Sequence, residues 1–322
     1  MESSWQQGLR EAFRDPKALA DHLAIPMQDL PPLPQVTAFP FLVPRPFAAR
    51  MRTGDPADPL LRQVWPDLSE GDVLDGERVD PVGDSASALE PGLLQKYNAR
   101  ALVVATGACA VHCRYCFRQN FPYDESPPAE WGRHLARLKE ETGLRECILS
   151  GGDPLTLTDS VLRSRIEDLD SAPHLRTVRI HTRLPVVLPD RVTPDLCATL
   201  SRTRLRVVVV LHANHPNEID GEVAVAASRL REAGVQLLNQ SVLLAGVNDQ
   251  ASILEDLSLR LWDCGILPYY LHALDPVSGS SRFSVPDGQA IELASDLRVR
   301  LPGYLVPRLV RELEGADSKT PL

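Results

Sequence analysis

The sequence predicts an α/β protein in which six strand–helix units form a partial, open, TIM-like barrel, a (βα)6 barrel. Two observations predict this architecture. Apolar, β-branched runs recur from residue 99 onward, and after the first run their starts lie about 30 residues apart, the length of one strand–helix unit. The segments between the runs repeat apolar residues with a helical period, which implies a parallel sheet covered by helices. Because a closed barrel of this type needs eight units, we expect this one to be open.

The predicted strands alternate with predicted helices along residues 99–271. The strands are Ala99–Ala105, Glu146–Ser150, Thr177–His181, Leu205–Leu211, Val235–Leu244 and Ile266–Leu271. Two of the intervening segments show the helical repeat most clearly, since their apolar residues recur every three or four positions. These residues are Leu162, Ile166 and Leu169 in one segment, and Ile253, Leu254, Leu257 and Leu261 in the other, after a predicted cap at Asn248 or Asp249.

The flanking regions are predicted to serve the barrel. Residues 1–95 are rich in proline and irregular, with short helical patterns near residues 5–24 and 57–66. We therefore expect residues 1–95 to form a mostly helical and irregular extension that wraps the core. Residues 96–285 are expected to form the partial barrel, and residues 286–322 a C-terminal segment.

Composition excludes several classes of protein. Hydrophobic residues make up 43% of the 322 residues, and a net charge of −9 argues against nucleic-acid binding as the main function. No apolar run approaches the length of a membrane span, and no basic region followed by an apolar stretch begins the chain. Six cysteines without a secretory signal indicate a reducing compartment. We expect a cytoplasmic protein with neither a membrane nor a nucleic-acid partner.

The most informative motif is a run of three cysteines, Cys109, Cys113 and Cys116, with the spacing C-x3-C-x2-C. A structural zinc site takes four protein ligands, and an ordinary iron–sulfur cluster takes four cysteines. Three thiolates leave one metal position for a ligand that is not protein, which favours a catalytic cluster. The alternatives are a zinc knuckle completed by His112 or an incidental group of buried cysteines. His112 directly precedes Cys113, so their side chains diverge.

The remaining cysteines carry no such pattern. Cys147, Cys197 and Cys264 lie in predicted strands or helices, and we expect them to be buried as small hydrophobic residues.

Candidate functional residues follow the predicted strands where each strand ends. The cysteine motif follows the first strand, Gly151, Gly152 and Asp153 follow the second, His212 ends the fourth, and Asp275 follows the sixth. Because parallel strands end at the same edge of a barrel, we expect these groups to share one mouth.

The cysteine spacing resembles the signature of the radical S-adenosylmethionine (SAM) enzymes. The resemblance implies a four-iron, four-sulfur cluster held by three cysteines, with SAM chelating the fourth iron and releasing a 5′-deoxyadenosyl radical on reduction. Tyr115 occupies the aromatic position beside the third cysteine and is implied to act near the adenine. The implied SAM-binding residues are Ser150, Gly151, Gly152, Asp153, His212 and Gln240.

Over residues 36–322 the chain resembles the lysine 2,3-aminomutase family more closely. The resemblance is carried by motifs that include the residues 97–100, 150–155, 212–218, 239–249 and 303–307. It implies a second cofactor, pyridoxal 5′-phosphate (PLP), bound as a Schiff base to Lys319, with Lys96, Tyr97 and Arg100 holding the phosphate. Only four of the 34 basic residues are lysines, which favours a chemical need for this one. The alternative is a solvated lysine on a frayed tail.

The same resemblance implies the substrate and the reaction. Arg118 matches the arginine that binds the carboxylate of L-lysine, and Asp275 matches one of two aspartates that face its terminal ammonium group. Glu312 stands where the family has the second aspartate. The radical would remove a hydrogen from the β-carbon, and the amino group would move there. The protein would thus be an isomerase that moves an amino group within one molecule.

The segment 41–47 and the ending at 317–322 resemble the branch that makes (R)-β-lysine, which a ligase attaches to translation elongation factor P. We also expect no C-terminal extension of the catabolic kind. A one-electron reductant, flavodoxin or ferredoxin, is implied as a partner. The alternatives are a catabolic aminomutase making (S)-β-lysine, a radical SAM enzyme without PLP, and an iron–sulfur carrier without catalytic activity.

Overall fold

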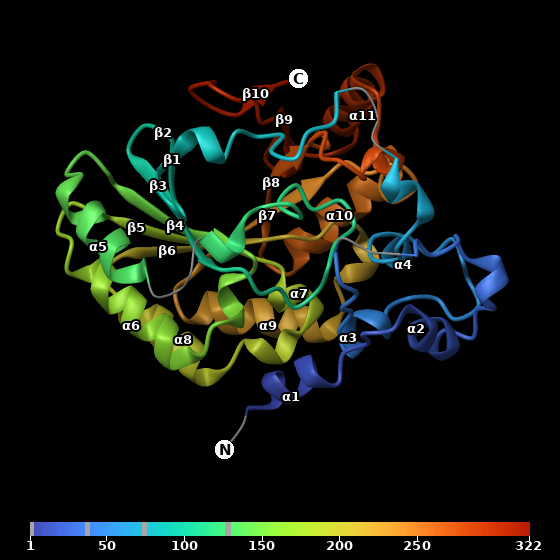
Figure 1. Ribbon diagram of the computed structural model, residues 1–322, viewed down its shortest axis with the longest axis horizontal. Coiled ribbons are helices and arrows are strands. Elements are labelled where there is room, and N and C mark those ends of the chain that lie inside the picture. Colours follow the sequence, from blue (N-terminus) through green and yellow to red (C-terminus); the bar gives the residue numbers. More distant parts are fainter. Residues whose placement is uncertain (1–2, 36–38, 73–75, 126–129) are drawn as a thin grey trace.

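The computed structural model describes residues 3–35, 39–72, 76–125 and 130–322. Its centre is one ten-stranded sheet in which each strand pairs with the next along the chain, from β1 to β10. Within the described residues β1 and β10 are the two edges, so the sheet curves without closing (Figure 1). The predicted fold class, an open partial barrel of alternating strands and helices, is confirmed.

All six predicted strands are present. They are β3 (Arg100–Thr106), β4 (Glu146–Gly151), β5 (Thr177–Thr182), β6 (Arg206–Leu211), β7 (Gln236–Val242) and β8 (Leu267–His272). Neighbouring members pair in parallel. Their β-branched and aliphatic residues alternate between a side covered by helices and the barrel interior.

The sheet contains four strands that the sequence did not predict. They are β1 (Ala88–Glu90), β2 (Leu93–Tyr97), β9 (Arg308–Arg311) and β10 (Thr320–Pro321). β9 extends the parallel part beyond β8, whereas β1, β2 and β10 pair antiparallel at the edges. These strands are short, and arginines or turns bound them, so no long apolar run marked them. The parallel part therefore has one strand more than the six that were predicted.

Helices follow the strands and cover the outer face of the sheet. They are α5 (Trp131–Glu140), α6 (Asp159–Asp170), α8 (Pro194–Arg202), α9 (Gly221–Glu232), α10 (Ala251–Asp263) and α11 (Asp287–Arg300). In Figure 1, α5, α6, α8 and α9 line one side of the sheet. The predicted apolar repeat of α6 is buried, and in α10 Leu254, Leu257 and Leu261 are buried while Ile253 is only half-buried.

The predicted cap of α10 is wrong by one to two residues, because Gln250 is the N-cap. Asn248 is buried instead, where its side chain accepts from Leu244 N at 2.7 Å and donates to Asn214 O at 2.9 Å. Asn248 therefore uses its side chain for hydrogen bonds to nearby backbone groups and does not cap the helix.

The first hundred residues pack onto the barrel through α1 (Ser4–Arg10), α2 (Pro16–His22), α3 (Arg45–Ala48) and α4 (Pro59–Arg62). Trp5, Phe13, Phe47 and Trp65 belong to the same buried cluster as the barrel strands. The domain boundaries at residues 95 and 285 stay a prediction. Across the described ranges no helix is long and apolar enough to cross a membrane.

The three cysteines outside the motif lie in the core to different degrees. Cys147 is fully buried in β4, as expected. Cys197 in α8 and Cys264 at the end of α10 are only half-buried, and they pack against the core from its margin. The expectation that Cys197 and Cys264 are buried was therefore wrong.

Candidate functional site

The cysteine loop begins where β3 ends and rests on the glycine pair at the end of β4. Gly152 N donates to Thr106 O and Asp153 N to Ala108 O, both at 2.7 Å. Gly151 has a φ of +114°, and a Cβ added to Gly152 would overlap the carbonyl oxygen of Ala108. Glycine is therefore required at these positions for the close approach of two backbones. The predicted contact of both glycines with SAM stays a prediction.

Asp153 ties the second and third parallel strands together. Its carboxylate accepts from Thr182 Oγ1 and Arg183 N at 2.7 Å, and from Leu184 N at 3.1 Å. Burial raises the pKa of Asp153, although these hydrogen bonds oppose the shift. Both carboxylate oxygens already have protein donors, so this side chain supports the loop. Its predicted contact with SAM is untested.

The donor set of Cys109, Cys113 and Cys116 fits an iron–sulfur cluster better than a single ion. All three are partly exposed and free. Burial raises the pKa of Cys109 and Cys116, the latter to about 11, so a metal is needed to hold them as thiolates. Within the described ranges no three His, Cys, Asp or Glu side chains converge on one ion position. A cluster does not require that convergence, because its thiolates bind different irons.

His112 is engaged elsewhere. Its Nδ1 lies 2.7 Å from Pro40 O, and its ring packs at 4.6 Å, centroid to centroid, against Phe39. The zinc knuckle completed by His112 therefore lacks its fourth ligand in this structure.

A buried polar group stands beside the cysteines, centred on Tyr115. The hydroxyl oxygen of Tyr115 accepts from Asn214 Nδ2 at 2.7 Å and Arg183 Nη1 at 2.8 Å. Its own hydrogen is then available to His212 Nε2, 3.0 Å away. Burial, with Arg183 nearby, lowers the pKa of His212 to about 3, so the imidazole is neutral and can accept. The rings of Tyr115 and His212 are stacked 5.8 Å apart.

Arg183 and Glu218 form an ion pair in this group that the sequence analysis missed. Arg183 Nη2 lies 3.0 Å from Glu218 Oε2 and 2.7 Å from Gln63 Oε1, and Nη1 donates to Cys113 Sγ at 2.7 Å. Gln63 comes from the N-terminal extension, which therefore completes the surroundings of the cysteine loop. Arg183 directly follows β5, and its place at a strand end was a signal that could have found it.

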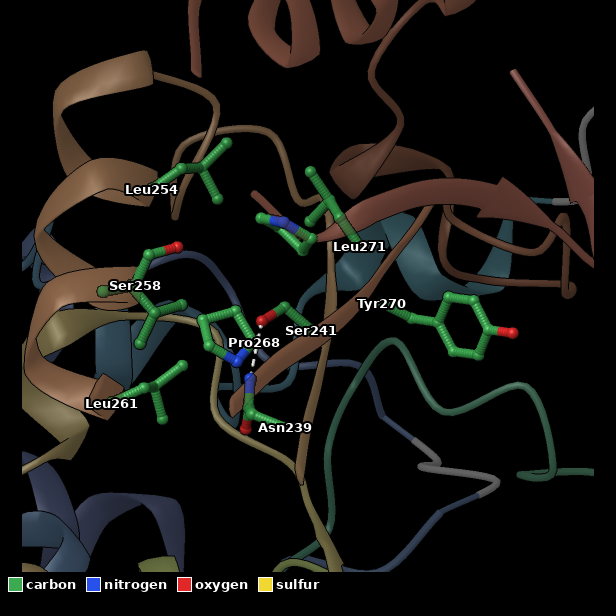
Figure 2. Close-up of a pocket in the computed structure, with 10 residues that line it drawn as sticks. Asn239, Ser241, Leu254, Ser258, Leu261, Pro268, Tyr270 and Leu271 are labelled. Carbon is green, nitrogen blue, oxygen red and sulfur yellow. Dashed lines mark hydrogen bonds between the residues drawn. The ribbon is translucent and has the colours of Figure 1, made fainter. Parts of the chain in front are cut away.

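Gln240 lies on the inner side of β7. Figure 2 shows Asn239 and Ser241 joined by a hydrogen bond and lining a small crevice against Leu254 and Leu261 of α10. Because side chains alternate along a strand, Gln240 points to the opposite side, into the barrel. It pairs there with Tyr270 of β8, whose ring points away from the crevice (Figure 2). The crevice thus lies where α10 packs on the outer face of the sheet, and it is separate from the mouth of the barrel.

A chain of alternating charges crosses the barrel from the C-terminus to the cysteine loop. Lys319 Nζ lies 2.5 Å from Glu312 Oε2, and Glu312 Oε1 lies 3.0 Å from Lys96 Nζ. Lys96 Nζ lies 2.7 Å from Asp84 Oδ1, and Asp84 Oδ2 accepts from Arg118 Nε at 2.8 Å. The predicted PLP lysine, one predicted phosphate ligand and the predicted carboxylate-binding arginine are therefore connected.

Lys319 does not lie on a free tail. It directly precedes β10, and its side chain is 20% exposed. Its Nζ lies 5.7 Å from the centroid of the Tyr270 ring. The paired strand and the neighbouring carboxylate hold the amine inside the barrel.

Tyr97 and Arg100 lie where β2 ends and β3 starts, at the opposite end of β3 from the cysteine loop. They face each other across the β2–β3 turn, where Ala99 has a φ of +62°. The guanidinium carbon of Arg100 lies 5.1 Å from the Tyr97 ring centroid. Burial, then the charge of Glu312, raises the pKa of Tyr97, so the phenol stays protonated as a donor. Glu312 is a neighbour of both Tyr97 and Lys96, and binding of one phosphate by Lys96, Tyr97 and Arg100 stays a prediction.

Several buried atoms of the site have no hydrogen-bond partner within the described residues. They include Asp275 Oδ1, His181 Nε2 and His272 Nε2. Burial, then the charge of Glu312, raises the pKa of Asp275 to about 7. Burial lowers the pKa of His272 to about 3. Because buried polar atoms are normally satisfied, these groups fit a polar ligand in the barrel, and the sequence analysis had singled out only Asp275.

Comparisons with known proteins agree with this arrangement. The family model "Radical SAM superfamily" matches residues 103–257. The L-lysine 2,3-aminomutase of Haemophilus influenzae is 45% identical over 99% of this chain and 95% of that protein. That of Escherichia coli is 43% identical over 99% of this chain and 94% of that protein. The Clostridium subterminale protein of the same name is 37% identical over 83% of this chain and 65% of its own length.

Proposed function

This chain belongs to the L-lysine 2,3-aminomutase family of radical SAM enzymes, and on that premise we propose that it converts L-α-lysine to (R)-β-lysine with PLP bound to Lys319. Membership of the family makes the protein an isomerase that uses an iron–sulfur cluster and SAM. The use of PLP, the (R) product and its delivery to elongation factor P form the proposal.

One observation carries the proposal, namely the charge chain from Lys319 to Arg118. A PLP enzyme acting on an amino acid needs an amine for the cofactor aldehyde, cations for its phosphate and a cation for the substrate carboxylate. The chain supplies these groups in one connected path. A radical SAM enzyme without PLP would have no chemical use for a half-buried lysine amine held against Glu312.

The residues would divide the work as follows. PLP, when bound, supplies a π system that stabilises the radical while the amino group moves. Lys319 anchors it, with Lys96, Tyr97 and Arg100 for its phosphate. Arg118 would bind the carboxylate of L-lysine, since a guanidinium group forms charge-assisted hydrogen bonds with carboxylates.

The carboxylates of Asp275 and Glu312 provide the negative side of the site. Lysine carries a second ammonium group, which needs an anionic partner inside a barrel. Glu312 has a lowered pKa, because Lys319 and Lys96 outweigh its burial, and is charged. Asp275 has an unpartnered oxygen available for a cation.

SAM would bind between Cys109, Cys113 and Cys116 and the residues Ser150, His212 and Gln240 at the mouth. Tyr115 and His212 are stacked and neutral, as suits packing against adenine. The electron that starts the reaction would come from flavodoxin or ferredoxin. Such a donor is expected in the cytoplasm.

Branch assignment is supported by sequence similarity. Identity is 45% and 43% to the Haemophilus and Escherichia proteins, against 37% to the Clostridium protein. With the similarity of residues 41–47, this supports (R)-β-lysine as the product and a ligase acting on elongation factor P as its consumer.

Anaerobic reconstitution tests the proposal. Protein loaded with iron, sulfide, PLP and SAM is given L-lysine and a reductant, and the β-lysine is resolved by chiral chromatography. We expect mainly (R)-β-lysine, and a borohydride-stable PLP adduct on the Lys319 peptide that is missing in Lys319→Ala. Mainly (S) product would contradict the branch. The absence of an adduct from the wild-type peptide would contradict the use of PLP.

A further inference from the structure

Asp84 is the one member of the charge chain to which no role has been given. It is 2% exposed and contacts two cations, with Oδ2 2.8 Å from Arg118 Nε and Oδ1 2.7 Å from Lys96 Nζ. Its neighbours lower its pKa despite burial, so the carboxylate is charged. A single anion therefore joins the residue proposed for the substrate carboxylate to a residue proposed for the cofactor phosphate.

The loop that carries Asp84 is itself fixed. Asp80 accepts from Asp84 N at 2.9 Å and from Ser85 N at 2.8 Å. Gly83 has a φ of +67°, which lets the chain turn before Asp84. Lys96 Nζ also donates to Val82 O at 2.8 Å. The position of this carboxylate is thus set by bonds within the N-terminal extension and by one bond from Lys96.

We propose that Asp84 is a positioning residue that orients Arg118 for the substrate carboxylate and Lys96 for the cofactor phosphate. This inference rests on the proposed function. Arg118 is held at two points, Nε by Asp84 and Nη1 by Ser150 Oγ at 3.0 Å. Two bonds on a planar guanidinium fix the plane of the group, and its Nη2 end is then presented to a carboxylate.

A purely structural role for Asp84 makes a different prediction. If the carboxylate only neutralised buried charge, its loss would lower stability and affect every ligand equally. If it positions Arg118, its loss weakens ligands that carry a carboxylate and spares those that lack one. L-Lysine and 1,5-diaminopentane differ by that carboxylate, so they separate the two roles.

The test compares three variants of the full chain. Asp84→Asn removes the charge at nearly constant volume, and Asp84→Glu restores it on a longer side chain. Asp58→Asn is the matched control, because Asp58 is also a fully buried carboxylate of the extension, yet its bonds go to the backbone amides of Arg52, Leu60 and Leu61. Binding of PLP is followed by absorbance without reductant, and binding of L-lysine or 1,5-diaminopentane by the change each causes in that absorbance.

In Asp84→Asn we expect L-lysine binding to weaken about tenfold or more, as for the loss of a charge-assisted hydrogen bond. PLP binding should weaken as well, while 1,5-diaminopentane binding to the PLP-loaded protein should hold within about threefold, and Asp84→Glu should recover part of the loss. Asp58→Asn should lower the melting temperature alone. Equal weakening of both amines, or unchanged L-lysine binding, overturns the inference. A wild-type protein that binds no PLP contradicts the proposed function instead.

Discussion

Replacing Asp275 with asparagine is expected to remove a loss of stability that the cofactor-free protein suffers as the pH rises, and to weaken the affinity for L-lysine. The carboxyl group is buried beside Glu312, and its Oδ1 has no partner in the part of the chain that the structure describes. Lys319, Lys96 and Arg311 offset only part of that penalty, and the pKa settles at about 7. A buried carboxylate without a cationic partner raises the free energy of the folded protein, and a bound cation would remove this penalty.

The size of the effect follows from proton linkage. The pKa of Asp275 is 3.8 in the unfolded chain and about 7 in the folded protein. The folded state therefore holds the proton more tightly, and the stability that this provides is complete below pH 3.8 and is lost as the pH rises to about 7. Between pH 5 and pH 8 the wild type loses about 3 kcal/mol through this group, at about 1.4 kcal/mol per pKa unit. An asparagine side chain does not titrate, so the variant does not share this loss.

Urea unfolding of both proteins at pH 5 and pH 8 measures the difference. The stability of Asp275→Asn relative to the wild type should be about 3 kcal/mol more favourable at pH 8 than at pH 5. In PLP-loaded protein the same variant should bind L-lysine at least about tenfold more weakly. A difference in unfolding free energy that is equal at the two pH values would refute the reasoning. Unchanged L-lysine affinity would refute the role of Asp275 toward the substrate ammonium.

Two further substitutions test the surroundings of the cysteines. Gly152→Ala places a Cβ against the Ala108 carbonyl oxygen. We expect the variant to keep the circular dichroism spectrum of a folded protein but to retain less than about half of the iron of the wild type. Full iron content would contradict the requirement for glycine where the two loops meet. Arg183→Met removes the guanidinium 2.7 Å from Cys113 Sγ, and the midpoint potential of the cluster, measured by EPR-monitored titration, should fall by about 60 mV, a tenfold change for one electron. The variant should also lose about 3 kcal/mol of stability, because Glu218 stays buried without its cation; an unchanged potential would show that Arg183 only stabilises the fold.

The strands that the sequence predicted and those that it missed differ in a physical way. Val207–Leu211 is a run of β-branched or aliphatic residues in which all but Val208 are buried. The other predicted strands contain shorter aliphatic runs or alternations, and these patterns leave a strong signal. β9 and the edge strand β10 are short, and their neighbours β8 and β9 supply the pairing. Their formation depends on tertiary contacts, which local propensity does not contain.

The residues of the candidate site also divide into those that the sequence predicted and those that it missed. Cys109, Cys113 and Cys116 form a pattern within eight residues, and such a local motif can be read directly. Asp84 reaches Arg118 over 34 positions, and Arg183 reaches Cys113 over 70. Neither residue belongs to a local motif, so only the folded chain brings them together. No motif spacing could have found Asp84, and for Arg183 the only signal was its position directly after β5.

The attachment of β10 has a consequence for how the enzyme is assembled. Its pairing consists of Thr320 opposite Arg311 and Pro321 opposite Val310, with one further bond from Leu322 N to Leu309 O at 3.3 Å. So short an edge pairing opens at a small fraction of the global free energy of unfolding. Lys319, which directly precedes β10, can thus move outward and return while every parallel strand keeps its hydrogen bonds. Under the proposed function, loading and replacement of PLP would then be local events. The amide hydrogen of Leu322 should exchange with solvent long before those of β6.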